Sequence, residues 1–102
     1  LSKNLNLHKN EILNVFQSGK ILKGKCLIIR FLSGHSGGAV LVQKKYGNAV
    51  RRNHFKRVVR VAIAKHESSL PKNIQFILQP MSHTRIISHQ KFSSDIFRFF
   101  NA

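Results

Sequence analysis

The chain has 102 residues, of which 18 are lysine or arginine and 3 are aspartate or glutamate, so its formal net charge is +15. This length suits one domain, and a hydrophobic fraction of 42% with eight phenylalanines is too apolar for a disordered basic tail. A folded domain with so large a positive charge repels itself, which favours a polyanionic partner, either a nucleic acid or an anionic membrane surface.

Cysteine usage and the length of the apolar stretches exclude further classes. The single cysteine, Cys26, rules out an internal disulfide and a cysteine-rich zinc site, and it fits a reducing cytoplasm. The longest apolar stretches are four residues, far below the roughly 18 that span a bilayer. We therefore expect no membrane span and no signal peptide. Because no Met precedes Leu1, we expect upstream residues to be missing.

The first half of the chain predicts a helix followed by strands. Residues 8–17 place apolar side chains at helical spacing and are followed by Ser18-Gly19, so they predict a short amphipathic helix. Residues 25–32 and 39–42 are rich in β-forming residues, with a glycine-rich loop at 33–38 between them. We expect these two strands to be neighbours joined as a hairpin, with an additional short strand near residues 19–23.

The second half predicts a helix, a strand and a closing helix. Residues 48–66 contain no Gly or Pro and have the length of a helix, and residues 73–79 alternate as a strand that ends at Pro80. Residues 89–100 place aromatic and aliphatic side chains on one side at spacings of three and four. With no linker or repeat, the chain reads as one α+β domain over residues 1–102.

Positive charge is concentrated in residues 44–65, which hold eight basic residues and no acidic one. At about 100° per residue, one arc of the helix collects the polar residues Arg52, Asn53, Lys56, Arg57 and Arg60. The opposite arc is apolar and can pack on a sheet, so it is not free to enter a membrane surface. No acid neutralises the cationic arc at i+3 or i+4, which favours nucleic-acid binding over a merely solvated face.

Catalysis by the chain itself has little support in the sequence. The six histidines are scattered, and the three acids, Glu11, Glu67 and Asp95, do not suffice for a two-metal carboxylate site. We interpret Glu11 as a first-turn residue, Glu67 as a helix-end residue and Asp95 as part of the exposed face of the last helix. No catalytic residue and no metal site is predicted. Cys26 and the phenylalanines of the last helix are expected in the core, whereas Phe16 suits either the core or an exposed binding wall.

Residues 42–60, which read VQKKYGNAVRRNHFKRVVR, resemble the signature of the bacterial ribonuclease P protein component. In that family a strand ends in a Lys-Lys-x-Gly-Asn-Ala-Val turn and continues into an Arg-Asn-Arg-x-x-Lys-Arg helix. Residues 9–16 are similar to the family's first helix. The resemblance spans almost the whole chain, more weakly outside residues 42–60.

The resemblance implies a single compact α-β-β-β-α-β-α sandwich with a left-handed β-α-β crossover. It also implies a bound catalytic RNA that removes 5′ leaders from precursor tRNA, and a cleft for the leader between the first helix and the sheet. Carried onto this sequence, the cleft residues are Phe16, Ile28 and Arg30. The RNA-binding residues are Lys44, Lys45, Arg51, Arg52, Asn53, Lys56, Arg57 and Arg60.

The chain departs from the family pattern at several positions. His54 stands where the family has its second signature arginine, Gln43 where a serine is usual, and Phe55 where an aliphatic residue is common. A neutral His54 removes one permanent charge from the RNA-binding set. The strand at 25–30 also lacks the aromatic residues common in the leader cleft.

The resemblance implies a protein subunit of a ribonucleoprotein endonuclease in the cytoplasm, with the catalytic centre in the RNA. Mg²⁺ is required by the RNA-based reaction and has no identifiable site in this chain. The expected partners are ribonuclease P RNA and precursor tRNA, with neither a membrane nor an obligate protein partner. The alternative is a basic ribosomal-type structural RNA-binding protein with no role in cleavage.

Overall fold

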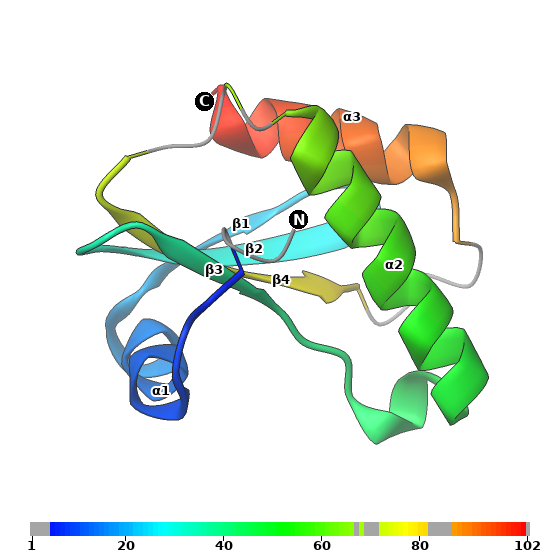
Figure 1. Cartoon of the computed structure of the whole chain (residues 1–102), viewed down its shortest axis with the longest axis horizontal. Helices are drawn as coiled ribbons and strands as arrows, with labels where there is room; N and C mark the ends of the chain where they lie inside the picture. Colours follow the sequence, from blue (N-terminus) through cyan, green and yellow to red (C-terminus); the bar gives the residue numbers. More distant parts are fainter. Residues whose placement is uncertain (1–4, 67, 69–71, 82–86, 102) are drawn as a thin grey trace.

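The computed structural model of the chain describes residues 5–66, 68, 72–81 and 87–101 (Figure 1). These residues fold into a four-stranded sheet with helices on both faces. In chain order the elements are α1 (Lys9–Ser18), β1 (Lys20–Lys23), β2 (Leu27–Ser33), β3 (Gly37–Val40), the 3-10 helix η2 (Lys44–Tyr46), α2 (Ala49–Lys65), β4 (Ile74–Pro80) and α3 (His89–Phe100). This order confirms the α-β-β-β-α-β-α prediction, including the short strand near residues 19–23.

The strands lie in the order β1-β2-β4-β3. The strands β1 and β4 both pair with β2 in antiparallel fashion, and β3 pairs with β4 in parallel, so that β3, α2 and β4 form the expected β-α-β crossover. The prediction that the strands before and after the glycine-rich loop form a hairpin is therefore wrong. The strand β4 lies between them because its residues 75–78 are buried on both faces, as a central strand requires.

Two glycines of the predicted loop, Gly37 and Gly38, belong to β3. Gly38 lies against the ring of Phe76 on β4, where a Cβ atom would come within 2.3 Å of the ring carbon Cζ. The loop that joins β2 to β3 is therefore shorter than expected. The glycine run at this position serves close packing of the edge strand in addition to the turn.

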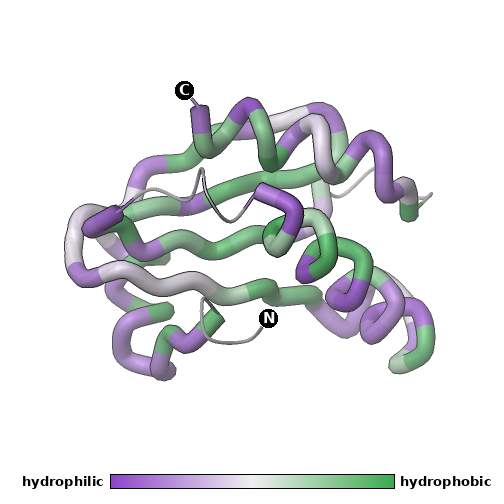
Figure 2. The backbone as a smooth tube through the Cα atoms, turned by 45° about the horizontal axis from the view of Figure 1, so that its top comes forward, coloured by the Kyte–Doolittle hydropathy of each residue, from purple (hydrophilic) through white to green (hydrophobic). Residues whose placement is uncertain are grey.

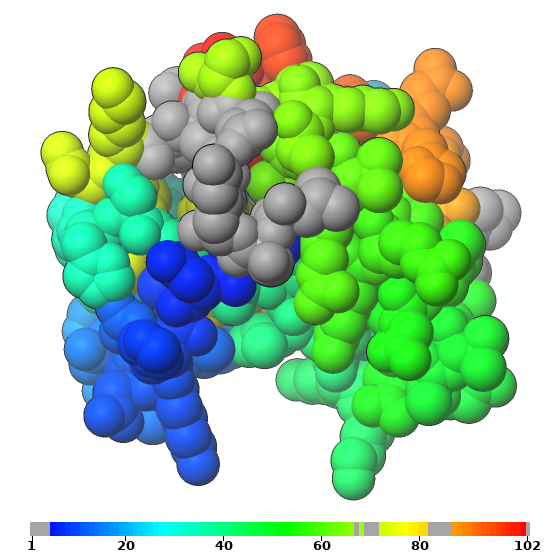
Figure 3. All heavy atoms as spheres, in the orientation of Figure 1, coloured from blue at the N-terminus to red at the C-terminus, as the bar shows by residue number. Residues whose placement is uncertain are grey.

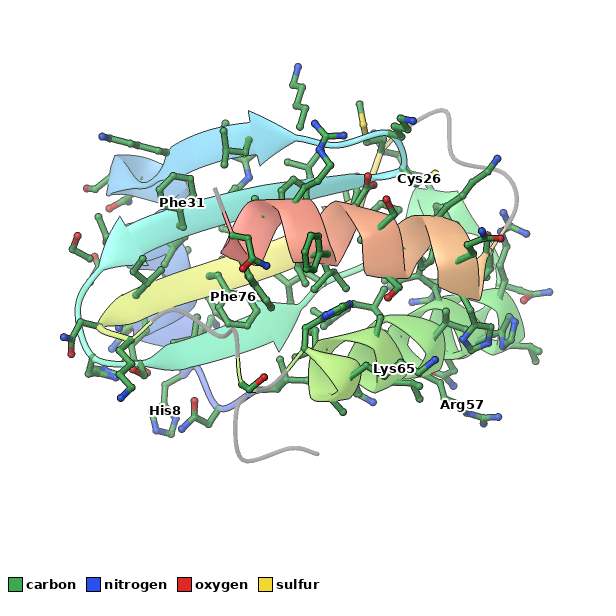
Figure 4. The ribbon with its side chains drawn as sticks, turned by 90° about the horizontal axis from the view of Figure 1, so that it is seen from above. His8, Cys26, Phe31, Arg57, Lys65 and Phe76 are labelled. Carbon is green, nitrogen blue, oxygen red and sulfur yellow. The ribbon has the colours of Figure 1, made fainter. Side chains whose placement is uncertain are left out.

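The two faces of the sheet are covered unequally. The helix α1 lies on one face, and α2 and α3 lie side by side on the other (Figure 1). The main core fills the space between the sheet and the α2–α3 pair, and apolar residues follow the central strands (Figure 2). Phe31 and Phe76 are register partners on β2 and β4, and they lie on the sheet face beneath α3 (Figure 4).

The apolar arc predicted for α2 is buried. Phe55, Val58, Val59 and Ala62 are all 3% exposed or less, and the ring of Phe55 makes edge-on contacts with those of its aromatic neighbours. The helix begins after Asn48, whose side chain accepts a hydrogen bond from the backbone N–H of Arg51 at 2.9 Å, as a capping asparagine should. The opposite, cationic arc is thereby held on the surface.

Two expectations for α3 are wrong. Phe92 and Phe100 are buried and Phe99 packs against the core, but Phe97 is 53% exposed. Asp95 is 1% exposed rather than on the open face. Its position three residues after Phe92 places it on the buried side of the helix, where the turn between β1 and β2 presents backbone donors that need an acceptor. Cys26 packs partly buried against the core, as predicted.

Candidate nucleic-acid interface

The basic face of α2 is the first part of the candidate interface. Asn53, Arg57 and Arg60 are exposed, and Arg52 and Lys56 are half-buried. Arg57 extends away from both the sheet and α3 (Figure 4). The five polar residues predicted to share an arc of this helix therefore reach the surface while the apolar arc anchors the helix. Guanidinium groups presented on a rigid helix are suited to bidentate contact with phosphates.

The turn before α2 holds two of these arginines in place. The Nε of Arg52 donates to the carbonyl oxygen of Gly47 at 3.1 Å. The guanidinium carbon of Arg51 lies 4.8 Å from the centre of the Tyr46 ring, within cation–π distance. Side chains that are already ordered lose less conformational entropy when they bind a ligand. Lys44 and Lys45 are exposed in the same turn, within η2.

An open groove of about 480 Å³ lies beside this turn, on the α1 side of the sheet. Figure 3 shows the surface hollowed between α1 and the η2–α2 region. We call it the sheet groove. It is lined by Lys23, Ile28, Arg30, Gln43, Lys45, Tyr46, Gln79, Pro80 and Met81.

Two of the predicted leader-cleft residues, Ile28 and Arg30, line the sheet groove, and the third, Phe16, contacts Arg30 beside it. Ile28 and Arg30 alternate with the core-facing residues of β2 and so point to the α1 side. The guanidinium carbon of Arg30 lies 4.7 Å from the centre of the Phe16 ring, and its Nε donates to Oε1 of Gln79 at 3.3 Å. Phe16 keeps 36% of its surface exposed, so it is not a core residue.

The sheet groove is cationic. Lys23, Arg30 and Lys45 come from three different elements, and none of its described lining residues is acidic. The hydroxyl of Tyr46 is buried and has no hydrogen-bond partner among the described residues. A groove with three cations, two amides and a neighbouring aromatic ring has the chemistry that single-stranded nucleic acid requires.

Several groove residues had no signal in the sequence. Gln79 is the register partner of Ile28 across β2 and β4. Tyr46 approaches the groove from η2, and Gln43 from the position just before η2. The only local signal was the alternation of β4, which places Gln75, Ile77 and Gln79 on one face. The pairing of β2 with β4 depends on contacts between residues far apart in the sequence. The composition of the groove could therefore not be predicted from neighbouring residues.

Glu11, in the first turn of α1, connects this helix to β4 and to the loop between β2 and β3. It accepts hydrogen bonds from the backbone N–H of His8 at 2.9 Å and from the Gln75 side chain at 3.1 Å, and it pairs with His35. The bond from His8 is the main reason that the pKa of this carboxyl is below its ordinary value of 4.5, and His35 adds to the effect against opposing desolvation. Glu11 is the first-turn residue that was predicted, with a bridging role that was not.

Candidate catalytic and metal-binding groups are dispersed. Across the described part of the chain, no three His, Cys, Asp or Glu side chains are arranged to hold a metal ion. His54, which replaces a signature arginine of the resembled family, is exposed on α2. Glu67 and His83 lie outside the described residues. Within the same described ranges, no helix combines the length and the hydrophobicity needed to cross a bilayer.

Comparison with known proteins decides the family. The family model described as Ribonuclease P matches residues 1–102, the whole chain. The chain belongs to the ribonuclease P family. The Ribonuclease P protein component of Brevibacillus brevis is 35% identical over 77 residues, covering 71% of this chain and 61% of that protein. The Ribonuclease P protein component of Thermotoga maritima is 28% identical over 75 residues, covering 71% of this chain and 64% of that protein. The chain thus spans less than two thirds of the length of both relatives.

Solved ribonuclease P proteins share the fold. The protein from Thermotoga maritima has a TM-score of 0.82 at 21% identity and covers 94% of each chain. A Staphylococcus aureus RNase P protein mutant also has a TM-score of 0.82, at 16% identity, covering 98% of this chain and 87% of that one. The mixed sheet with helices on both faces is therefore the fold of ribonuclease P proteins.

Proposed function

We propose that this chain is the protein subunit of a ribonuclease P ribonucleoprotein, which binds the catalytic RNA and the 5′ leader of precursor tRNA and assists removal of the leader. The observation that carries the proposal is a pair of adjoining cationic surfaces, the basic face of α2 and the sheet groove, in a chain of this family. Precursor tRNA as substrate makes the cytoplasm the proposed site of action.

The basic face of α2 suits a structured RNA. Arg57 and Arg60 are exposed, and the hydrogen bond from Arg52 to Gly47 orients a third guanidinium group. Arginine forks bind phosphates in a fixed geometry, and Asn53 between them adds a donor and an acceptor for a sugar or base. We assign the RNA subunit to this surface.

The sheet groove suits the single-stranded leader. Arg30 covers part of the Phe16 ring, and the remaining exposed part offers a surface on which a base can stack. Because Oε1 of Gln79 already accepts from Arg30, its amide nitrogen is the group left to donate to the RNA. A structural RNA-binding protein of ribosomal type would not need such a groove beside its basic helix.

The described carboxylates of this chain do not fit a magnesium site. Glu11 is engaged with His8, Gln75 and His35, and Asp95 accepts three backbone N–H groups in the interior. Mg²⁺ prefers oxygen ligands with several waters and favours phosphate-rich sites. We therefore assign the Mg²⁺ required for cleavage to the RNA subunit, and to the protein the binding and positioning of RNA.

A stimulation assay tests this function. The protein is added to a bacterial ribonuclease P RNA at low Mg²⁺ concentration, and cleavage of precursor tRNA is measured. We expect cleavage to accelerate and the products to keep the same 5′ end. RNA binding without stimulation would favour the ribosomal-type alternative. Cleavage by the protein with no RNA subunit present would contradict RNA-based catalysis.

A further inference from the structure

A second groove lies on the other side of the sheet, where the end of α2 meets the outer face of α3. We call it the α2–α3 groove. Its volume is about 480 Å³, within the range of about 300–1,000 Å³ that is typical of small-ligand sites. Its lining includes Lys65, His66, His89, Gln90, Ser93 and Phe97. None of these residues belongs to the basic arc of α2 or to the sheet groove.

An ordered aromatic platform forms one wall of the α2–α3 groove. Phe97 is 53% exposed, although the other phenylalanines of α3 pack into or against the core. The ring of His66 lies 5.7 Å from that of Phe97, centre to centre, and its Nε2 is 2.9 Å from the hydroxyl oxygen of Ser93. His66 is thus held against α3 by two contacts, and the Phe97 ring keeps half of its surface open to a ligand.

The surroundings of Phe97 point to an anionic and planar ligand. Lys65 and His89 are exposed at the groove, and Gln90 and Ser93 add hydrogen-bonding groups. No acidic side chain occurs among the described residues that line it. An apolar protein interface would surround the exposed ring with further hydrophobic residues, whereas an aromatic ring beside a lysine, histidines, an amide and serine hydroxyls has the composition of a nucleotide-stacking site.

We propose that the α2–α3 groove binds a nucleotide of single-stranded RNA, with the base stacked on Phe97 and the phosphate contacted by Lys65 and His89. This inference rests on the proposed function in taking RNA as the partner. It adds a second RNA surface on the face of the sheet opposite the sheet groove. An RNA strand held there is separated from the leader by the whole thickness of the domain.

Nuclear magnetic resonance on the full chain, labelled with ¹⁵N and titrated with a short oligouridylate, tests the location. We expect saturable shifts of the backbone amides of His66, Ser93 and Phe97, together with shifts of Ile28 and Arg30 in the sheet groove. If only the sheet groove responds, this inference fails and the proposed function stands. If only the α2–α3 groove responds, the assignment of the leader to the sheet groove fails instead.

Matched variants test the chemistry. Phe97→Ala should raise the Kd reported by the His66 and Ser93 amides about tenfold, as expected for loss of one stacking platform. Leu22→Ala removes an apolar side chain that is 40% exposed and should leave that Kd unchanged. Equal effects of the two variants would overturn the proposal.

A charge substitution gives a second test that does not depend on packing. Lys65→Gln should lower the slope of log affinity against log salt at this groove by about 0.7, as one lost phosphate contact does in single-stranded RNA. Lys72→Gln removes an equal charge elsewhere and should leave the slope unchanged. If the groove amides shift on dilution of the protein alone, the groove is a contact between copies of the chain, which also overturns the proposal.

Discussion

The carboxylate of Asp95 on α3 lies directly against Gly24, in the turn between β1 and β2. A Cβ atom at Gly24 would come within 2.6 Å of the carboxyl carbon of Asp95. This close approach lets the carboxylate accept hydrogen bonds from three successive backbone N–H groups, those of Lys25 at 3.0 Å, Cys26 at 2.8 Å and Leu27 at 3.0 Å. The buried side chain of Asp95 thereby links α3 to the turn between β1 and β2.

Removing this charge should destabilise the fold. Asp95→Asn keeps the size of the side chain but replaces one acceptor oxygen by a donor, so we expect the free energy of unfolding to fall by about 2–3 kcal/mol. Urea denaturation monitored by circular dichroism measures the loss. Ser94→Ala, one residue earlier and exposed, is the control and should change stability by less than about 0.5 kcal/mol. Equal stability of the two variants would show that the three bonds contribute nothing net.

The basic face of α2 should determine the salt dependence of RNA binding. Replacing Arg52, Lys56 and Arg60 together by Gln should reduce affinity for the RNA subunit and lower the log–log salt slope by about 2–3, since each phosphate contact contributes about 0.7–0.9. Filter binding across a salt series measures the slope. The triple replacement of Lys9, Lys20 and Lys72 by Gln removes the same charge from other surfaces. A slope that falls equally in both variants would place the RNA interface elsewhere.

Phe16 should distinguish precursor tRNA from mature tRNA. Because the ring is partly exposed beside Arg30, Phe16→Ala should weaken binding of precursor tRNA to the holoenzyme by about 1–3 kcal/mol, the range for loss of a stacked base, and leave mature tRNA binding unchanged. Leu22→Ala, on the opposite face of the sheet, serves as the matched control. Equal losses for both tRNAs would assign Phe16 a structural role instead.

Glu11 should make stability depend on acid. Its pKa is lower in the folded chain than the ordinary value of 4.5, mainly because the His8 backbone N–H donates to it. The stabilisation is therefore fully present above about pH 4.5 and is lost as the pH falls through the lower folded-state pKa. Urea denaturation at neutral pH and below pH 4 should show a smaller acid-induced loss for Glu11→Gln than for the unmodified chain. Equal acid-induced losses of stability in the two proteins would show that Glu11 does not contribute to the acid dependence.

Tyr46 offers a test of a stabilising substitution. Its hydroxyl is buried without a partner among the described residues, and such a group costs about 1–3 kcal/mol. Tyr46→Phe keeps the ring contacts with Arg51 and Phe55 and should raise the melting temperature. Calorimetry of the RNA-free protein measures the change. A lower melting temperature would show that the hydroxyl makes a bond in solution.

The sequence by itself determined the local features of this protein. The apolar arc of α2, which includes Phe55 and Val59, and the run of cations on the same helix depend on residues within one or two turns, so they were predicted correctly. The family was evident from residues 42–60 for the same reason, because its signature is one continuous turn and helix. The net charge of +15 indicated a polyanionic partner without any knowledge of the fold.

Only the tertiary structure decided which distant residues meet. The insertion of β4 between β2 and β3 joins Gln79 to Arg30, 49 residues apart, and the burial of Asp95 joins residues 70 apart. Strand order and the choice of buried acceptor depend on long-range packing, which neighbouring residues do not encode. The same packing leaves Phe97 on the surface while Phe92 and Phe100 enter the core, because a helix that covers a sheet buries one side only.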